Sequence, residues 1–390
     1  MARKILTLNI ISEKGLARLP KNYVVGNDLQ DPDGILVRSH IMHDMDIPVT
    51  VRVIGRAGAG TNNIPVQQLS KRGVVVFNTP GANANAVKEL VIAGMLIGAR
   101  NIFQAAKFVD TLKGSDEELL KQAEAGKKHY IGRELYGSTL GIIGLGSIGS
   151  MLADAAINLG MQVIGFDPEI TVDGAWRLSA QVKKAASVDE VVRQADFVSL
   201  HVPLSSATKN MIDAERIKMM KKGAILLDFA REGIVDEQAA LDGLNDGRLH
   251  AYLSDFPSNL LRQHERFIAL PHLGASTEEA EENCAVMVAE QVTDYLENGN
   301  IMNSVNFPNI YMTRESKYRL AIANQNVPNM LGQISTMMAE AGLNIKNMIN
   351  KSRGDLAFTL ADVECEVSKA LIARLSSING VLRVRHLTLK

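Results

Sequence analysis

The sequence is poor in cysteine, contains no long apolar run and has no excess of charge of either sign. Its two cysteines, Cys284 and Cys365, lie far apart, which excludes a disulfide framework and a zinc-binding pattern and fits a reducing compartment. The longest apolar candidate for a membrane span, Leu90 to Ala99, has about half the length that a transmembrane helix needs. The 42 basic and 43 acidic residues give a formal charge of −1, so the overall charge indicates neither nucleic acid nor an anionic membrane as a partner. We therefore expect a cytoplasmic protein.

The chain length of 390 residues predicts two or three domains, and the first hundred residues alternate short apolar runs with turns. The run from Arg3 to Ile11 is interrupted by Asn9 and lacks a small-residue cleavage site, which favours a first strand over a signal peptide. Asn83 to Arg100 is apolar nearly all round, which predicts a helix buried between domains or subunits. Three further buried strands are expected over Gly34–Arg38, Val49–Ile54 and Val74–Phe77.

Residues 140 to about 272 alternate apolar runs with helical segments, a pattern typical of a doubly wound parallel sheet. A long helix is expected over Ser276–Asn298. The fold class is therefore α/β. The expected strands cover Leu140–Ile143, Gln162–Phe166, Phe197–His201, Ala224–Asp228 and Phe267–Leu270.

A small third unit ends the chain. Ile301–Glu315 has little periodicity and is interpreted as a linker. A helix opened by Pro328 and a hairpin around Arg353-Gly-Asp355 follow, so that the element order is βαββαβ, a ferredoxin-like arrangement. The remaining elements are expected over Arg319–Asn324, Ile345–Asn350, Ala357–Val363, Ala370–Leu375 and Val381–Leu389.

A glycine-rich turn suited to a dinucleotide follows the first strand of the doubly wound region. Gly144, Gly146 and Gly149 form a G-x-G-x-x-G pattern between this strand and a helix. The glycines permit close backbone approach, and the helix N-terminus offers amide donors to a pyrophosphate. Asp167 ends the second strand, where a carboxylate can accept both ribose hydroxyls and would repel a 2′-phosphate. The pattern predicts NAD rather than NADP; a tight turn without a ligand is the alternative.

Two side chains suited to chemistry follow later strands. Arg231 comes just after the strand that ends at Asp228, where a guanidinium fork can hold a substrate carboxylate and polarise the adjacent carbonyl. His272 follows another strand, and an imidazole can take up a hydroxyl proton and return it. His201 ends a strand and is expected to line the cofactor cleft instead of acting in catalysis. Together these residues predict hydride transfer to or from a hydroxy acid.

The motifs resemble the D-isomer-specific 2-hydroxyacid dehydrogenases over essentially the whole chain. The glycine turn is one of five matching signatures, and the one at Pro271 to Thr277 is the most specific to the branch that acts on D-3-phosphoglycerate. The other four are Arg56 to Asn62, Asn78 to Gly81, Ala230 to Glu237 and Pro271 to Thr277. The resemblance implies NAD-linked oxidation of D-3-phosphoglycerate to 3-phosphohydroxypyruvate, the entry to serine biosynthesis, with Arg231 and His272 as the catalytic pair.

The resemblance also implies how the chain is divided and which residues bind ligands. A discontinuous substrate domain would use residues 1–98 and 275–305, around a dinucleotide domain at 99–274, and residues 318–390 would form an ACT domain. Arg38 and Arg56 are expected to bind the phosphorylated substrate, although either could be a solvated charge. Other substrate positions are Ser39, Ala57 and Gly58. Cofactor positions beyond the glycines and Asp167 are Thr79, Ser147, Ile148, His201, Val202, Pro203, Phe229, Ala230, Asp255, Gly274 and Ala275.

The sequence departs from the family pattern at two places. The glutamate that usually pairs with the catalytic histidine is missing from Ser254 to Asn259, so either another acid serves or His272 works unassisted. Asp255 is the first candidate for that acid and Glu265 a weaker one. In the third unit, Asn329 stands where glycine is usual after Asn326, which puts binding of an amino acid effector such as serine in doubt beside a structural dimer role.

Three hypotheses follow from this reading. The first is the phosphoglycerate enzyme, acting as a homodimer or homotetramer with NAD and without a metal. The second is another dehydrogenase of the same chemistry, acting on glyoxylate, hydroxypyruvate or an unphosphorylated 2-hydroxy acid. The third is a non-catalytic NAD-sensing protein, which the missing glutamate would favour.

Overall fold

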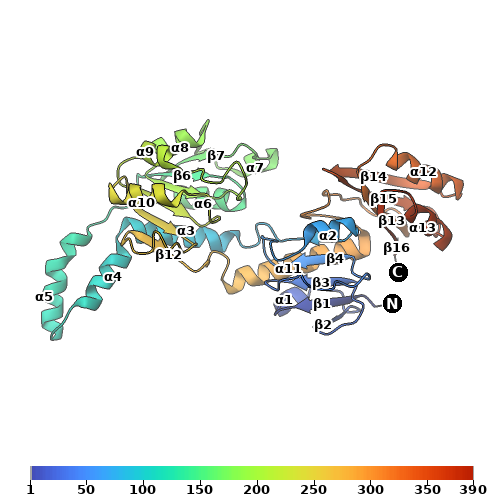
Figure 1. Ribbon diagram of the computed structural model, residues 1–390, viewed down its shortest axis with the longest axis horizontal. Coiled ribbons are helices and arrows are strands. Elements are labelled where there is room, and N and C mark those ends of the chain that lie inside the picture. Colours follow the sequence, from blue (N-terminus) through green and yellow to red (C-terminus); the bar gives the residue numbers. More distant parts are fainter. Residues whose placement is uncertain (1, 390) are drawn as a thin grey trace. The chain divides into compact units, whose positions relative to one another are not determined.

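The computed structural model describes residues 2–389, and backbone contacts divide the chain into two compact units. Unit 1 runs to Asn83 and resumes at Glu278, while unit 2 comprises Ala84–Thr277. Each unit contains its own parallel sheet, and unit 1 adds a smaller antiparallel sheet (Figure 1). The predicted α/β class, with two Rossmann-like sheets and a terminal βαββαβ module, is confirmed.

The parallel sheet of unit 1 is covered on both faces because its strands are apolar throughout. Alternate residues of β3 enter opposite cores: Ile35 and Val37 pack toward α2 (Val66–Lys71), and Leu36 packs toward α11 (Glu278–Asn298). The strand order is β2-β1-β3-β4-β5, the flavodoxin-like order of a doubly wound sheet. The strands are β1 (Lys4–Leu8), β2 (Val24–Gly26), β3 (Gly34–Val37), β4 (Val53–Arg56) and β5 (Val75–Phe77).

One expected strand in unit 1 begins later than predicted. The apolar run starting at Val49 suggested a strand over residues 49–54, but β4 begins at Val53. The amide of Val51 donates to the carbonyl of Pro48 at 3.2 Å, and the Val49 side chain is 82% exposed. The first residues of the apolar run therefore belong to the turn after the proline and not to the strand.

The sheet of unit 2 has seven parallel strands in the order β12-β11-β10-β9-β6-β7-β8. The order reverses between β6 and β9, which is where open α/β sheets bind their ligands. Helices α3 (Ala84–Ala99) and α6 (Ser147–Asn158) cover one face, and α8 (Val188–Gln194), α9 (Ala214–Met219) and α10 (Glu237–Asn245) cover the other. The strands are β6 (Thr139–Ile143), β7 (Gln162–Phe166), β8 (Val182–Lys184), β9 (Phe197–Leu200), β10 (Ala224–Asp228), β11 (Leu249–Ser254) and β12 (Phe267–Ala269).

Helix α3 packs in unit 2, where Val91 and Met95 are buried against the sheet while Leu96 is exposed. The domain boundaries expected near residues 98 and 275 stay a prediction. Helices α4 (Ile102–Thr111) and α5 (Asp116–Gly126) project from the body of this unit and have no buried residue (Figure 1). Over residues 2–389, no helix combines the length and apolar character needed to cross a membrane.

The C-terminal module has the sheet order β14-β15-β13-β16. Its helices α12 (Met330–Glu340) and α13 (Lys369–Ser376) cover one face, and the other face joins the core of unit 1 through residues such as Phe358. The interpretation of residues 301–315 as a linker is wrong in one respect, because Phe307 lies fully buried in the same core. The strands are β13 (Tyr318–Gln325), β14 (Ile345–Arg353), β15 (Leu356–Val363) and β16 (Val381–Thr388).

A buried ion pair fixes this module to the end of α11. The side chains of Arg319 and Asp362 are fully buried, and Arg319 donates to both carboxylate oxygens, at 2.6 and 2.9 Å. It also donates to the carbonyls of Asn298, Met312 and Thr313. All five guanidinium donors are thus satisfied.

We predict that Arg319→Ala destabilises the protein by about 3–5 kcal/mol, because it leaves the Asp362 carboxylate buried without its partner. Arg374→Ala is the matched control, since Arg374 pairs with Glu340 at the surface and such pairs are worth about 0–1 kcal/mol. Urea unfolding measures both. Equal losses in the two variants would contradict a structural role for the buried pair.

Candidate dinucleotide and catalytic site

Three glycines shape the turn between β6 and α6, each for a different reason. Gly144 has φ of +95°, and a Cβ there would lie 2.5 Å from the carbonyl oxygen of His201. A Cβ on Gly149 would lie 2.0 Å from the carbonyl oxygen of Gly144, whereas nothing lies within 4 Å of a Cβ built on Gly146. The turn therefore needs glycine at its first and third positions and leaves open space at its second.

The N-terminus of α6 offers free amide donors beside this space. Gly146 is the N-cap residue and no side chain caps the helix. The first amides of a helix have no partner within it, and their dipoles favour an anion. These features fit the pyrophosphate of a dinucleotide, which the amides of Ser147 and Ile148 would hold.

Asp167 lies directly after β7 and is fixed beside the glycine turn. One carboxylate oxygen accepts the amide of Leu145 at 2.8 Å, and the other accepts the amide of Glu169 at 2.9 Å. Each oxygen keeps a further lone pair for a ribose hydroxyl. This arrangement fits the adenosine half of NAD, because a 2′-phosphate would meet a carboxylate held in place.

His201 follows β9, across the switch point from the glycine turn. Its Nε2 lies 2.9 Å from the hydroxyl of Ser199, and its Nδ1 is buried without a hydrogen-bond partner in the part of the chain that the structure describes. Burial lowers its pKa to about 4, so the ring is neutral at pH 7. Val202 and Pro203 continue the same loop. These features favour His201 as a residue that lines the cofactor site over one that transfers a proton.

Arg231 stands at the carboxyl end of β10 with an accessible guanidinium. Its Nη1 donates to the carbonyl of Ala230 at 2.7 Å, and it forms no salt bridge with any carboxylate of residues 2–389. The preceding Phe229 is buried and packs against Gly94 of α3, which anchors the start of the loop. The guanidinium is therefore available to a carboxylate ligand.

His272 lies beyond β12 in a turn with left-handed backbone. Its φ is +57°, and its amide donates to the carbonyl of Asp255 at 3.0 Å. The exposed ring packs at an angle on Phe256, with 5.1 Å between ring centroids. This aromatic neighbour was not predicted, because the contact depends on the fold of two separate loops.

Asp255 is fully buried, and its carboxylate points at the turn that carries His272. One oxygen accepts the amide of Leu273 at 2.8 Å and the other accepts the amide of Gly274 at 2.7 Å. The contacts found for this carboxylate are thus with backbone beside His272. Glu265, the weaker candidate for the missing acid, is 76% exposed and lies beside Arg266.

The residues expected to bind the substrate, apart from Arg231 and His272, lie in unit 1, beyond β3 and β4. Arg56 Nε donates to the carbonyl of Arg38 at 3.1 Å, and the amide of Gly58 donates to the hydroxyl of Thr79 at 2.8 Å. Arg38 also pairs with Glu281 at 2.5 Å. Ser39 and Ala57 lie in the same two loops. The acid on α11 was missed from the sequence, although several glutamates in its first turn were visible there.

The two asparagines suggested for an effector lie at the start of α12. The Asn326 side chain donates to the carbonyl of Gly354 at 3.1 Å, so it supports the turn between β14 and β15. Asn329 is the N-cap residue of α12 with φ of +62°, a left-handed conformation that asparagine tolerates.

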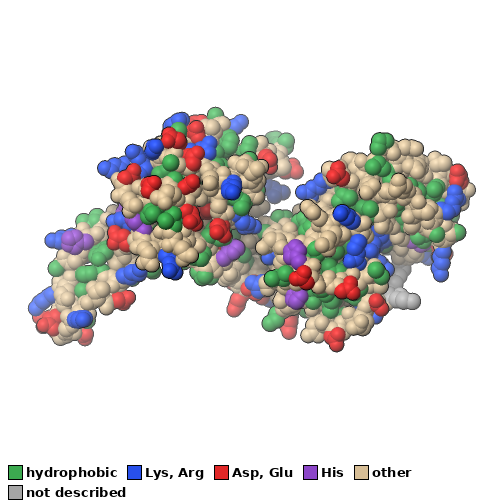
Figure 2. Space-filling model, viewed as in Figure 1, with side chains coloured by type: hydrophobic (Ala, Val, Ile, Leu, Met, Phe, Trp, Pro, Cys, Tyr) green, Lys and Arg blue, Asp and Glu red, His purple; other side chains and the backbone are tan. Residues whose placement is uncertain are grey.

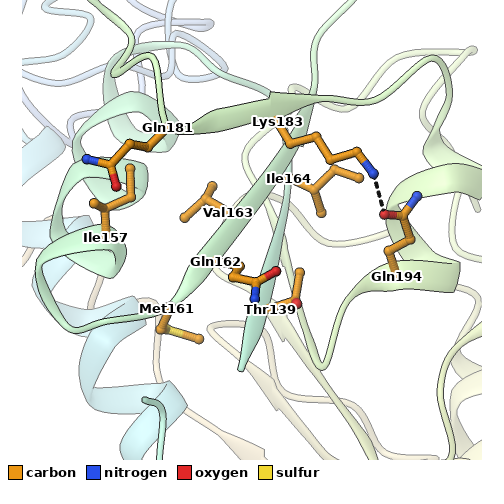
Figure 3. A pocket seen from close by; sticks show the side chains of 9 residues that line it. All are labelled: Thr139, Ile157, Met161, Gln162, Val163, Ile164, Gln181, Lys183 and Gln194. Carbon is orange, nitrogen blue, oxygen red and sulfur yellow. Dashed lines mark hydrogen bonds between the residues drawn. The ribbon is translucent and has the colours of Figure 1, made fainter. Parts of the chain in front are cut away.

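The structure also contains a cavity of about 280 Å³ at the opposite end of the unit 2 sheet. Thr139 and Gln162, which begin β6 and β7, line it together with Lys183 and Gln194, whose side chains are joined by a hydrogen bond of 2.7 Å (Figure 3). Ligands of open α/β sheets bind at the carboxyl ends of the strands, so this cavity is unrelated to the candidate site.

Acidic and basic side chains are interspersed over the visible face, without a broad field of one sign (Figure 2). Within residues 2–389, no cluster of three or more histidine, cysteine, aspartate or glutamate side chains is arranged to hold a metal ion.

Comparison with known proteins identifies the family. Residues 92–274 match the model of the D-isomer specific 2-hydroxyacid dehydrogenase NAD binding domain. A Haemophilus influenzae protein is 32% identical over 367 residues, which cover 91% of this chain and 86% of the relative. The chain belongs to the D-isomer-specific 2-hydroxyacid dehydrogenases, and unit 2 carries their NAD-binding domain.

Two of the similar proteins have the same name. The Haemophilus influenzae relative is named D-3-phosphoglycerate dehydrogenase, and so is one from Methanocaldococcus jannaschii that is 35% identical over 344 residues. This chain spans 62% of the length of the latter. The NAD+-bound 3-phosphoglycerate dehydrogenase of Entamoeba histolytica has a similar structure, with a TM-score of 0.59 and 28% identity over 78% of this chain and 99% of that chain.

Proposed function

We propose that this protein catalyses the NAD-dependent oxidation of D-3-phosphoglycerate to 3-phosphohydroxypyruvate, the first step of L-serine synthesis. The observation that carries the proposal is the placement of Arg231 and His272 after β10 and β12 of one NAD-binding sheet. The names of the similar proteins support the choice of substrate.

The proposed roles follow from the chemistry of each side chain. The Arg231 fork binds the substrate carboxylate and polarises the oxygen on C2. His272 takes the proton of the C2 hydroxyl during oxidation and returns it during reduction. The chemistry that NAD+ would supply when bound is the acceptor for the hydride that leaves C2. The glycine turn and Asp167 would hold the pyrophosphate and the ribose, and Phe229, Ala230, Gly274 and Ala275 of the same unit would line the cofactor.

Two further arginines support a phosphorylated substrate. Arg38 and Arg56 lie in adjacent loops of unit 1 and are joined by a hydrogen bond. The ion pair with Glu281 holds the Arg38 guanidinium in place. We propose that both bind the phosphate, with Ser39, Ala57 and Gly58 of the same loops completing the site.

The exposed apolar side chains of α4 bear on the oligomeric state of the protein. We propose a cytoplasmic homodimer or homotetramer, in which helix α4 contributes to contact between copies because Ile102, Phe103 and Val109 are exposed. The Asn326 side chain already binds the turn between β14 and β15, which argues against an amino acid effector at Asn326 and Asn329.

An assay of NADH formation tests the function. The purified protein is offered D-3-phosphoglycerate, glycerate, glycolate and D-lactate with NAD+, each with and without serine. The proposal expects kcat/KM to be highest for the phosphorylated acid. A preference for an unphosphorylated acid would indicate another dehydrogenase of the family, and NAD binding without turnover would indicate a sensor.

Replacing Asp167 with serine should abolish the preference for NAD over NADP. The change removes the carboxylate that would repel a 2′-phosphate and binds the ribose hydroxyls. Steady-state assays with both cofactors measure the ratio of kcat/KM values. Asp173→Ser, in the nearby helix α7 (Val172–Arg177), is the control. An unchanged ratio in the Asp167 variant would remove this residue from cofactor selection.

A further inference from the structure

Two buried aspartates lie side by side at the carboxyl end of the unit 2 sheet, one beneath each proposed catalytic loop. Asp228 ends β10, and Asp255 follows β11, the neighbouring strand. Their exposed fractions are 1% and 0%. The amide of Asp255 donates to the carbonyl of Asp228 at 3.0 Å, so the two residues are joined through the backbone.

Each carboxylate binds the backbone of a different loop. Asp228 accepts the amide of Ala230 at 3.0 Å and also the amide of Arg231. Asp255 accepts the amides of Leu273 and Gly274, while its carbonyl accepts the amide of His272. Three hydrogen bonds to Asp255 thus hold the left-handed turn at His272.

We infer that Asp228 and Asp255 are paired positioning residues, of which the first fixes the loop of Arg231 and the second fixes the turn of His272. This inference rests on the proposed function, because it assigns the two aspartates to the chemistry of that site. It also explains how the protein can work without the usual glutamate, because Asp255 orients His272 through the backbone of its turn.

The surroundings of Asp228 raise its pKa, so its hydrogen bonds to the Arg231 loop depend on pH. Burial raises the pKa of Asp228 to about 7, against the opposing effects of the Ala230 and Arg231 amides and the Arg231 charge. The charge of Asp255 raises it further, and Tyr252 faces it from β11. Two glutamates, Glu232 and Glu237, line the same small space.

The direction of the pH effect follows from this pKa. Between pH 4 and 7 the folded protein holds a proton on Asp228 that the unfolded chain has released, because the unfolded pKa is 3.8. Stability therefore falls as pH rises through this window. The charged carboxylate is the stronger acceptor for the two loop amides, so order in the Arg231 loop rises with pH.

Asp228→Asn and Asp255→Asn test the inference, with Asp213→Asn as the matched control. Asp213 accepts the amide of Arg216 at 2.9 Å as the N-cap of α9, so this variant also removes a backbone-binding carboxylate, but one that binds the start of a helix instead of the Arg231 loop or the His272 turn. The measurements are hydrogen–deuterium exchange of the substrate-free protein, kcat across pH, and melting temperature at pH 5 and pH 8.

Asp255→Asn should speed exchange of the Leu273 and Gly274 amides by about tenfold or more, the value of a hydrogen bond to a charged group. It should lower kcat by about 10²-fold, the loss expected when a catalytic group is misplaced by 1 Å. Asp228→Asn should likewise speed exchange of the Ala230 and Arg231 amides and lower kcat. It should also remove the transition in kcat that the wild-type protein shows near pH 7. The difference in melting temperature between pH 5 and pH 8 should be smaller in this variant than in the wild-type protein.

The inference would be overturned if the amides of residues 273–274 exchanged in Asp255→Asn at the wild-type rate. It would also be overturned if Asp255→Asn lost no more kcat than Asp213→Asn. The exchange experiment needs no substrate. Failure of the wild-type protein to oxidise D-3-phosphoglycerate would therefore count against the proposed function alone, while the exchange rates still decide whether the aspartates hold the loops.

Discussion

Replacing His272 with asparagine should lower kcat by about 10²–10⁴-fold, the usual contribution of a positioned acid–base group. Asparagine is the substitution of choice because the residue has φ of +57°, and asparagine is among the side chains that tolerate this region. The three backbone bonds to Asp255 are then retained. The variant therefore removes the imidazole and preserves the turn.

The control for this variant is His129→Asn, which changes an exposed histidine of the 3-10 turn Lys127–Tyr130. Its kcat should stay at the wild-type value. NADH binding, followed by fluorescence titration, should be similar in both variants, since neither residue holds the dinucleotide in this account. A kcat for His272→Asn close to that of the control would show that another group moves the proton.

Replacing Arg231 with lysine should lower kcat/KM by about 10²–10³-fold even though the positive charge is kept. The guanidinium fork forms two parallel hydrogen bonds to a carboxylate, and an ammonium cannot reproduce that geometry. Steady-state kinetics with D-3-phosphoglycerate measure the loss. Arg193→Lys on α8 serves as the control, because its guanidinium lies at the surface near Met219.

A second substrate turns this variant into a test of the specific contact. The amide analogue, in which a carboxamide replaces the carboxylate, lacks the charged partner of Arg231. The wild-type enzyme should lose much of its kcat/KM with the amide, and Arg231→Lys should lose little more, so that the two changes are not additive. Additive losses would mean that Arg231 and the carboxylate do not interact.

Local patterns predicted the geometry of the proposed dinucleotide site. The glycines, the helix after them and Asp167 form a unit within one βαβ segment, where spacing along the chain determines proximity. The positions of Arg231 and His272 at strand ends followed from apolar runs in the same way. The terminal βαββαβ module was predicted because its hairpin and helices are marked by local turn residues.

The rest depended on contacts between distant segments. The bounds of strand β11 were not predicted, since Leu249–Ser254 mixes apolar residues with His250 and Ser254. The pairing of Asp228 with Asp255 exists only through the register of β10 against β11. Asp228 was visible only as the end of a strand. The burial of Phe307 in a segment interpreted as a linker likewise required the C-terminal sheet that covers it.

Transfer of deuterium from the substrate to the cofactor measures the proposed hydride transfer itself. D-3-phosphoglycerate labelled with deuterium at C2 is incubated with the protein and NAD+, and the reduced cofactor is analysed by mass spectrometry and NMR. The account predicts one deuterium in the nicotinamide ring for each 3-phosphohydroxypyruvate formed. Cofactor reduced without the label, or no reduction with this substrate while NAD+ still binds, would contradict it.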